Sequence, residues 1–227
     1  MEYIKKLRGD FRLLICDNTN LDLQDTQKLK SLISNFSTDL FEMKIDGFDG
    51  FTHGASLDFL VSKTQTEIIG MMDFDFFWIY PDIISYVHEL FKQGYEAVGC
   101  AGWYPDFQRV IDTNFPERAG HLAPVVWGQF LTRDLAISDT FICTKEESGL
   151  NNFETGWRIR KKIIEDKIPA KIFPGFKYPN QLDSEVCYFG SFDAPLGFHI
   201  LKGTNRIFDY QLIRKMLDEG FEFWKEE

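Results

Sequence analysis

The chain lacks the features that mark several large protein classes. No basic cluster is longer than the segment 158–162, and the formal net charge is −10, from 25 Lys+Arg against 35 Asp+Glu. Proteins that wrap nucleic acid or lie on an anionic membrane need a basic footprint, so we expect no nucleic-acid partner. The most apolar stretch, 67–80, contains two Asp and falls short of the roughly 20 residues of a membrane span. We therefore expect no integral membrane segment and no signal peptide.

Cysteine is scarce, and its spacing excludes paired motifs. The sequence has 4 Cys, and no two of them form a C-x-x-C pair for zinc or redox chemistry. The simplest interpretation is a reduced, cytoplasmic protein. Aromatic residues are abundant by contrast, at 16%, and most of them should be core. Because the 227 residues contain no repeat or linker, we expect one domain over 1–227.

Apolar runs and helical periodicities alternate along the chain. Continuous apolar runs predict strands at 11–18, 67–75, 97–103, 124–133 and 171–174. Apolar residues at helical spacing predict helices at 23–36, 55–65, 81–93, 154–166 and 207–219. This alternation predicts an α/β fold with a mostly parallel central sheet and helices on both faces.

Acidic residues follow two of the predicted strands. Asp17 ends the first, and Asp73 and Asp75 follow the run 68–72. In a parallel sheet, ligands bind at the carboxyl ends of the strands. Two carboxylates at i and i+2 can converge on Mg²⁺ or Mn²⁺, and such a cation is often shared with a diphosphate. An Asp at a strand end also starts ordinary turns, so the pair alone leaves both interpretations open.

Several segments in order resemble a family 2-like glycosyltransferase of the GT-A fold. They are LLICDNT, HGASLDFLVSKTQTEIIGMMDFDFFW, HLAPVVWGQFLTR, NNFETGWRIRKKI and GFHILKGTNR. The resemblance is densest over 53–78 and implies a single GT-A-like (Rossmann-like) domain. It also implies a strand ahead of Phe11 that the preceding residues do not supply, so we expect the usual first strand to be missing.

The resemblance implies a nucleotide-binding set. Asp17 would hydrogen-bond the base, with Asn18 beside it. His53 and Gly54 would lie where the backbone passes close to the sugar nucleotide, because glycine permits close approach. Asp73 would bind the ribose. From the residues alone, Asp17 is equally an Asx turn and His53 a surface loop histidine.

The resemblance also implies a metal site and its surroundings. Asp73, Asp75 and His199 would hold Mn²⁺ or Mg²⁺, for which carboxylate and imidazole are competent ligands. Lys202 and Arg206 would bind the diphosphate and offset charge on the leaving group. From the residues alone, His199 can also be a core or surface histidine with satisfied hydrogen bonds. Lys202 and Arg206 can also be solvated charges in a loop.

Glu154 matches an acidic position that serves as the catalytic base in such enzymes. It would take the proton of the acceptor hydroxyl during inverting transfer. At the start of a predicted helix it has an ordinary explanation too, since a carboxylate there interacts favourably with the helix dipole. His121 and Gln129 would lie on the acceptor side.

The sequence thus predicts a metal-dependent hexosyltransferase. It would transfer a sugar from a UDP- or GDP-linked donor to a hydroxyl of a carbohydrate or glycolipid acceptor. The alternative is a degenerate relative that binds a sugar nucleotide or glycan without turnover, because the first strand is missing. A phosphatase is disfavoured because its D-x-D belongs on the first strand. The donor sugar, the acceptor and assembly into a homo-oligomer stay open.

Overall fold

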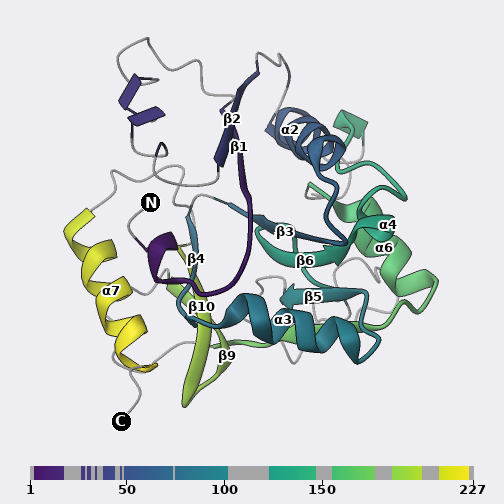
Figure 1. Cartoon of the computed structure of the whole chain (residues 1–227). Coiled ribbons are helices and arrows are strands. Elements are labelled where there is room, and N and C mark those ends of the chain that lie inside the picture. The colour runs from purple at the N-terminus through teal and green to yellow at the C-terminus, as the bar shows by residue number, and fades with distance from the viewer. Residues whose placement is uncertain are drawn as a thin grey trace.

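The computed structural model describes most of the chain. The described residues are 3–17, 27–28, 30–31, 34, 38–43, 47, 49–73, 75–101, 123–146, 155–176, 186–200 and 210–224. Within them the strands form three β-sheets (Figure 1). No helix in these ranges is long and apolar enough to cross a membrane.

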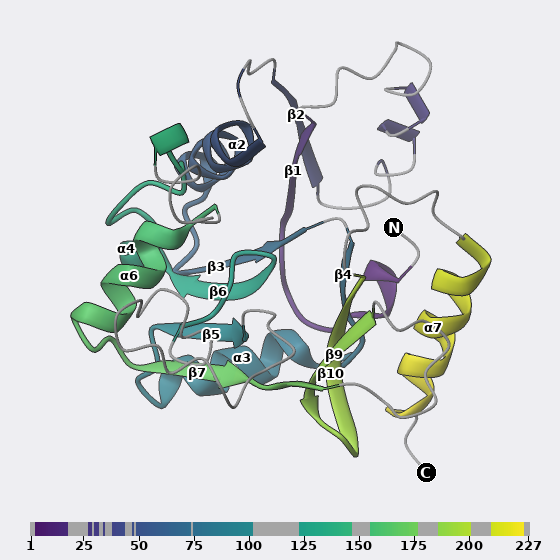
Figure 2. The ribbon, with the colours of Figure 1, turned by 180° about the vertical axis from the view of Figure 1, so that it is seen from behind.

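A four-stranded sheet forms the centre of the molecule. Its spatial order is β3-β6-β5-β7, with strands β3 (Ile68–Met72), β6 (Gly128–Thr132), β5 (Ala97–Cys100) and β7 (Ala170–Phe173). Strand β6 runs antiparallel to both of its neighbours, and β5 runs parallel to β7. Figure 2 shows β7 beside β5. Strands β3, β5 and β7 therefore point the same way, and the end of β3 that leads into Asp73 lies at their shared carboxyl edge.

Helices cover both faces of this sheet. They are α2 (Asp49–Lys63), α3 (Ile83–Lys92), α4 (Arg133–Ala136) and α6 (Trp157–Glu165). On one face, α3 buries Ile83, Val87 and Leu90, which repeat at helical spacing. On the other face, Val61 of α2 and Ile163 of α6 pack with the second set of strand side chains.

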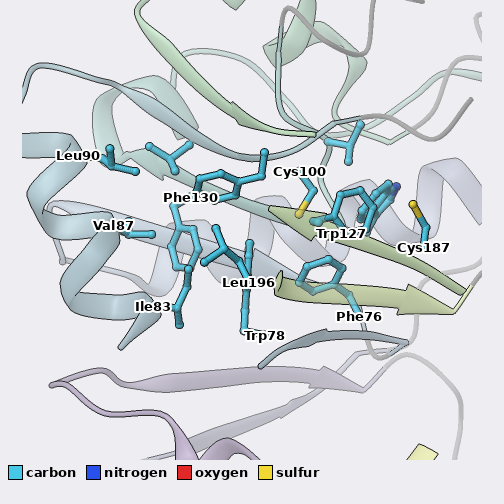
Figure 3. Close-up of a cluster of buried hydrophobic side chains, with 14 residues drawn as sticks. Phe76, Trp78, Ile83, Val87, Leu90, Cys100, Trp127, Phe130, Cys187 and Leu196 are labelled. Carbon is cyan, nitrogen blue, oxygen red and sulfur yellow. The ribbon is translucent and has the colours of Figure 1, made fainter. Parts of the chain in front are cut away.

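A second four-stranded sheet is antiparallel throughout. Its order is β4-β10-β9-β8, with strands β4 (Phe76–Trp78), β10 (Ala194–Ile200), β9 (Val186–Ser191) and β8 (Gly175–Phe176). Phe76 and Trp78 turn inward to the core shared with α3 (Figure 3). Phe77 and Phe198 face the opposite way, where α7 (Tyr210–Glu222) and the short helix η1 (Ile4–Lys6) cover them.

A separate pair of parallel strands lies beside α2. Strand β1 (Leu13–Asp17) pairs with β2 (Thr38–Glu42). The apolar run at 11–18 therefore does form a strand. Its residues are only half-buried, whereas the sequence predicts burial on both faces.

The predicted fold class, a GT-A-like (Rossmann-like) domain on a mostly parallel central sheet, is wrong. Two of the three strand pairs in the central sheet are antiparallel, and every pair in the second sheet is antiparallel. A strand covered on both faces reads as a continuous apolar run whichever way it points, because the pattern reports burial and not direction. The run at 124–133 thus predicts β6 but not its reversal.

The sequence also fails to predict the second sheet. Strand β4 is three residues long and continues directly from the apolar run before it. In β9, Gly190 has φ +116°, and the pairing of β9 with β10 shifts register between Pro195 and Gly197. Glycine, proline and a bulge break the period-2 alternation by which a strand is recognised.

Candidate functional site

The D-x-D turn connects the two large sheets. Asp73 follows β3 of the central sheet, and Asp75 precedes β4 of the antiparallel sheet. The backbone N–H of Phe76 donates to the carbonyl of Asp73 at 3.2 Å and closes the turn. The chain thus turns between the two aspartates, and both lie at the junction of the sheets.

Strand β10 brings His199 to this turn. His199 lies opposite Phe76 in the antiparallel register of β10 and β4, and the N–H of Ile200 donates to the carbonyl of Asp75 at 3.0 Å. The Nε2 atom of His199 is 3.1 Å from Oδ1 of Asp75, across 124 residues of sequence. Asp75 is buried and His199 is largely buried, with side chains 8% and 11% exposed. Two residues that the sequence predicts as metal ligands therefore touch.

Helix α2 brings a second histidine to the other aspartate. Nε2 of His53 lies 3.2 Å from Oδ1 of Asp73, and this pair is half-buried. Burial alone would lower the pKa of His53, but the hydrogen bond with Asp73 and the charges of Asp73 and Asp75 raise the pKa above its ordinary value. The helix begins at residue 49, earlier than the predicted 55, so His53 is a helical residue and not a loop histidine.

Gly54 has a packing reason that the sequence does not reveal. A Cβ atom at this position would lie 2.4 Å from the carbonyl oxygen of Phe141 and 2.5 Å from Cα of Ile142. Asp58, one turn later, accepts from the N–H of Phe141 at 2.8 Å. Glycine therefore permits close approach of α2 to the chain's own backbone at 141–142. Its contact with a nucleotide stays a prediction.

Asp17 lies at the carboxyl end of β1, outside the central sheet. The carbonyl of Asp17 accepts from the N–H of Met43 at 2.9 Å. Strand β1, which ends at Asp17, packs against α2, the helix that carries His53.

Other predicted site residues lie outside the described ranges. They are Asn18, His121, Glu154, Lys202 and Arg206. Their predicted roles therefore stay predictions. Gln129 is described: it is buried on β6, and its Nε2 lies 3.3 Å from the sulfur of Met71.

Trp127 is a neighbour of the site that no sequence pattern indicates. Its indole stacks on the imidazole of His199, with ring centroids 4.4 Å apart and an interplanar angle of 7°. Its carbonyl accepts from the N–H of Asp73 at 3.3 Å. The sequence predicts only that most aromatic residues belong to the core, and that prediction includes no histidine partner.

The donor atoms fit a divalent cation as pairs. In the described part of the chain, no three His, Cys, Asp or Glu side chains converge closely enough to hold a metal ion. The Asp75–His199 and His53–Asp73 pairs are 3.1 and 3.2 Å apart. Adjacent ligands of an octahedral ion at about 2.1 Å are about 3.0 Å apart. Since Mg²⁺ is commonly bound through one or two carboxylates plus substrate phosphates, these residues suit a cation shared with a diphosphate.

Comparisons with known proteins add little to this geometry. No family model matches the chain, and no curated protein matches it. A solved structure to which the fold is similar is the crystal structure of A197 from STIV, with a TM-score of 0.41 and 12% sequence identity. The alignment covers 85% of this chain and 95% of that one. A similarity this weak carries no functional argument, and the comparisons assign the chain to no family.

Proposed function

We propose that the protein is a metal-dependent glycosyltransferase. It transfers a hexose from a UDP- or GDP-linked donor to a hydroxyl of a carbohydrate or glycolipid, with inversion. The observation that carries the proposal is that the His53–Asp73 pair and the Asp75–His199 pair lie on the two aspartates of one turn between the sheets. The sequence singles out these four residues from three separate segments, and no local pattern requires them to meet.

The arrangement of the four side chains supports a donor-binding role. Asp75 and His199 are held by the backbone pairing of β4 with β10, so their donor atoms keep a defined spacing. Asp73 is anchored through its own N–H, and Nε2 of His53 lies against its carboxylate. When bound, Mn²⁺ or Mg²⁺ neutralises the diphosphate and the departing nucleoside diphosphate.

Charge supports the requirement for a cation. The chain carries a net charge of −10, and the site presents Asp73 and Asp75 to a donor that is itself anionic. Repulsion between like charges opposes donor binding unless a cation lies between them. The proposal therefore includes metal dependence.

The remaining roles belong to the same proposal. Glu154 takes the proton from the acceptor hydroxyl, Lys202 and Arg206 bind the diphosphate, and Asp17 with Asn18 binds the base. A cytoplasmic location is also proposed. It is supported by the four cysteines, none of which forms a disulfide.

One observation favours the alternative of binding without turnover. The hydrogen-bonded contact between Asp75 and His199 already pairs the two atoms that a metal would need. A protein that keeps this contact closed would bind a sugar nucleotide or glycan through other groups. The two functions differ in whether the nucleoside diphosphate is released.

A nucleotide-sugar panel tests the proposal. Release of nucleoside diphosphate is measured with Mn²⁺, with Mg²⁺ and with a chelator for the wild type, Asp75→Asn and Asp218→Asn. Asp75→Asn should lower the metal-dependent rate about 100-fold or more. Asp218→Asn removes an equal charge from an exposed ion pair with Lys6 and should leave the rate unchanged.

The outcomes separate the two functions. An undiminished rate in Asp75→Asn contradicts the metal assignment. Calorimetry with UDP and GDP, with and without Mn²⁺, covers the alternative: binding with no release from any donor identifies a non-catalytic protein.

A further inference from the structure

Trp127 contacts both halves of the candidate site. Its indole face lies parallel to the imidazole of His199, 7° from coplanar and 4.4 Å away between centroids. Its carbonyl oxygen accepts from the N–H of Asp73. One residue thus connects the end of β3, which carries Asp73, with β10, which carries His199.

The indole of Trp127 is held in place on several sides. Its ring lies 5.2 Å from Phe189 and 5.8 Å from Phe76 between centroids (Figure 3). The turn before β6 is closed by the N–H of Gly128, which donates to the carbonyl of Val125 at 3.2 Å. A Cβ at Gly128 would lie 2.8 Å from the ring of Phe76, so glycine lets that ring pack close. The indole is a fixed wall of the site.

The stack matters for His199 because, among the described residues, its ring lacks the second hydrogen bond that usually fixes a metal-binding histidine. A metal-binding histidine nearly always donates its other ring N–H to a carboxylate, a carbonyl or water, which fixes the plane of the ring. Nδ1 of His199 is buried and has no hydrogen-bond partner in the described part of the chain. Asp75 fixes only one edge of the ring at Nε2. The plane of the ring is set by the stack on Trp127.

We propose that Trp127 is a positioning residue that orients His199 for a divalent cation by stacking, in place of a hydrogen bond at Nδ1. This inference rests on the proposed function, in which His199 is a metal ligand. Trp127 acts through His199 and does not touch the cation. Its effect on metal affinity therefore requires the imidazole.

Binding of Mn²⁺ to the full-length protein, alone and with UDP or GDP present, tests the inference. The free ion is counted by its electron paramagnetic resonance signal during titration of each variant. Trp127→Leu should weaken Mn²⁺ binding by about 10- to 100-fold, the usual effect of losing a group that orients a metal-binding side chain. Trp127→Phe keeps a flat face and should stay closer to the wild type than to Trp127→Leu.

Two further variants separate positioning from general damage to the core. Trp78→Leu removes an indole from the same buried cluster, where Trp78 is 4% and Trp127 8% exposed. The indole of Trp78 packs on Phe76, Phe130 and Phe173. Trp78→Leu should therefore bind Mn²⁺ with the affinity of the wild type. In a His199→Ala background, Trp127→Leu should cause no additional loss, because coupled residues are not additive.

A measurement on the wild type keeps the inference testable if Trp127→Leu does not fold. Carbon–proton correlation spectra should show the Hε1 proton of His199 shifted upfield by the ring current of the indole. The signal is assigned by its absence in His199→Ala. An unshifted signal overturns the stack, and with it the positioning role.

The outcomes distinguish this inference from the proposed function. If the wild type binds Mn²⁺ and His199→Ala weakens binding, but Trp127→Leu does not, the role of Trp127 is wrong and the metal site stands. Equal losses in Trp127→Leu and Trp78→Leu also overturn positioning. If the wild type binds no Mn²⁺, either alone or with UDP or GDP present, the metal site itself is wrong, and both proposals fail.

Discussion

The two histidine–aspartate pairs have nearly equal spacing and different surroundings. Asp75 and His199 are 8% and 11% exposed, whereas Asp73 and His53 are 26% and 38% exposed. The first pair is held between two strands of a sheet, and the second joins a helix to a strand end. Solvent screens an exposed pair and lets it open at little cost, whereas a buried pair loses its only partner when it opens. The Asp75–His199 pair, called the inner pair, therefore keeps a fixed spacing, and the His53–Asp73 pair, called the outer pair, is adaptable.

The largest stability effect should come from moving α2, the helix that carries His53 of the outer pair. Gly54→Ala puts a Cβ within 2.4 Å of the Phe141 carbonyl, and α2 must shift. Overpacking of this kind costs about 1–3 kcal/mol or more, although Ala normally favours a helix over Gly by about 1 kcal/mol. Urea denaturation measures the loss. Ala55→Gly in the same helix is the control and measures the difference in helix propensity between Ala and Gly. A Gly54→Ala variant more stable than the wild type would contradict the close packing of Gly54 on the Phe141 carbonyl.

The two pairs should differ when one aspartate is removed. Asp75→Ala leaves Nε2 of the largely buried His199 without a partner and should cost about 1–3 kcal/mol of unfolding free energy. Asp73→Ala breaks the half-buried pair and should cost less than about 1 kcal/mol. Denaturation of both variants in a chelator-containing buffer tests the comparison. Equal losses would show that burial does not separate the pairs.

The smallest expected effect is a pH dependence of the outer pair. The pKa of His53 is raised in the folded protein. The protonated ring favours the folded state, so this contribution is full at pH below the unfolded pKa of about 6.5 and is lost as pH rises through the raised folded value. Thermal melts of the metal-free wild type and His53→Gln across this range should differ in slope. Equal slopes in the two proteins would show that the charge of this pair does not contribute to stability.

Local patterns predict many of the individual elements. The helices at 83–92 and 157–165 and the strands at 68–72 and 170–173 form inside or close to their predicted ranges. Each has a strong 3.6-residue period or a short apolar run of its own. Strand direction has no such signal. The sequence pattern therefore does not distinguish the mostly parallel sheet that it predicts from the mixed sheet that forms.

The candidate site also combines features that the sequence predicts with features that it does not. The residue types at 53, 73, 75 and 199 show which chemistry is available, because carboxylates and imidazoles can be read directly from the chain. Their partners depend on tertiary structure: the register of β10 on β4 brings His199 to Asp75 across 124 residues. The placement of α2 brings His53 to Asp73.

The composition of the chain is determined by the sequence by itself. Few cysteines, a net charge of −10 and short apolar runs are properties of the residues themselves and need no fold to be read. Strand order, strand direction and the stack of Trp127 on His199 come from the tertiary structure alone. They are pairings between distant segments, and their free energy depends on burial and contact geometry that no local window of sequence contains.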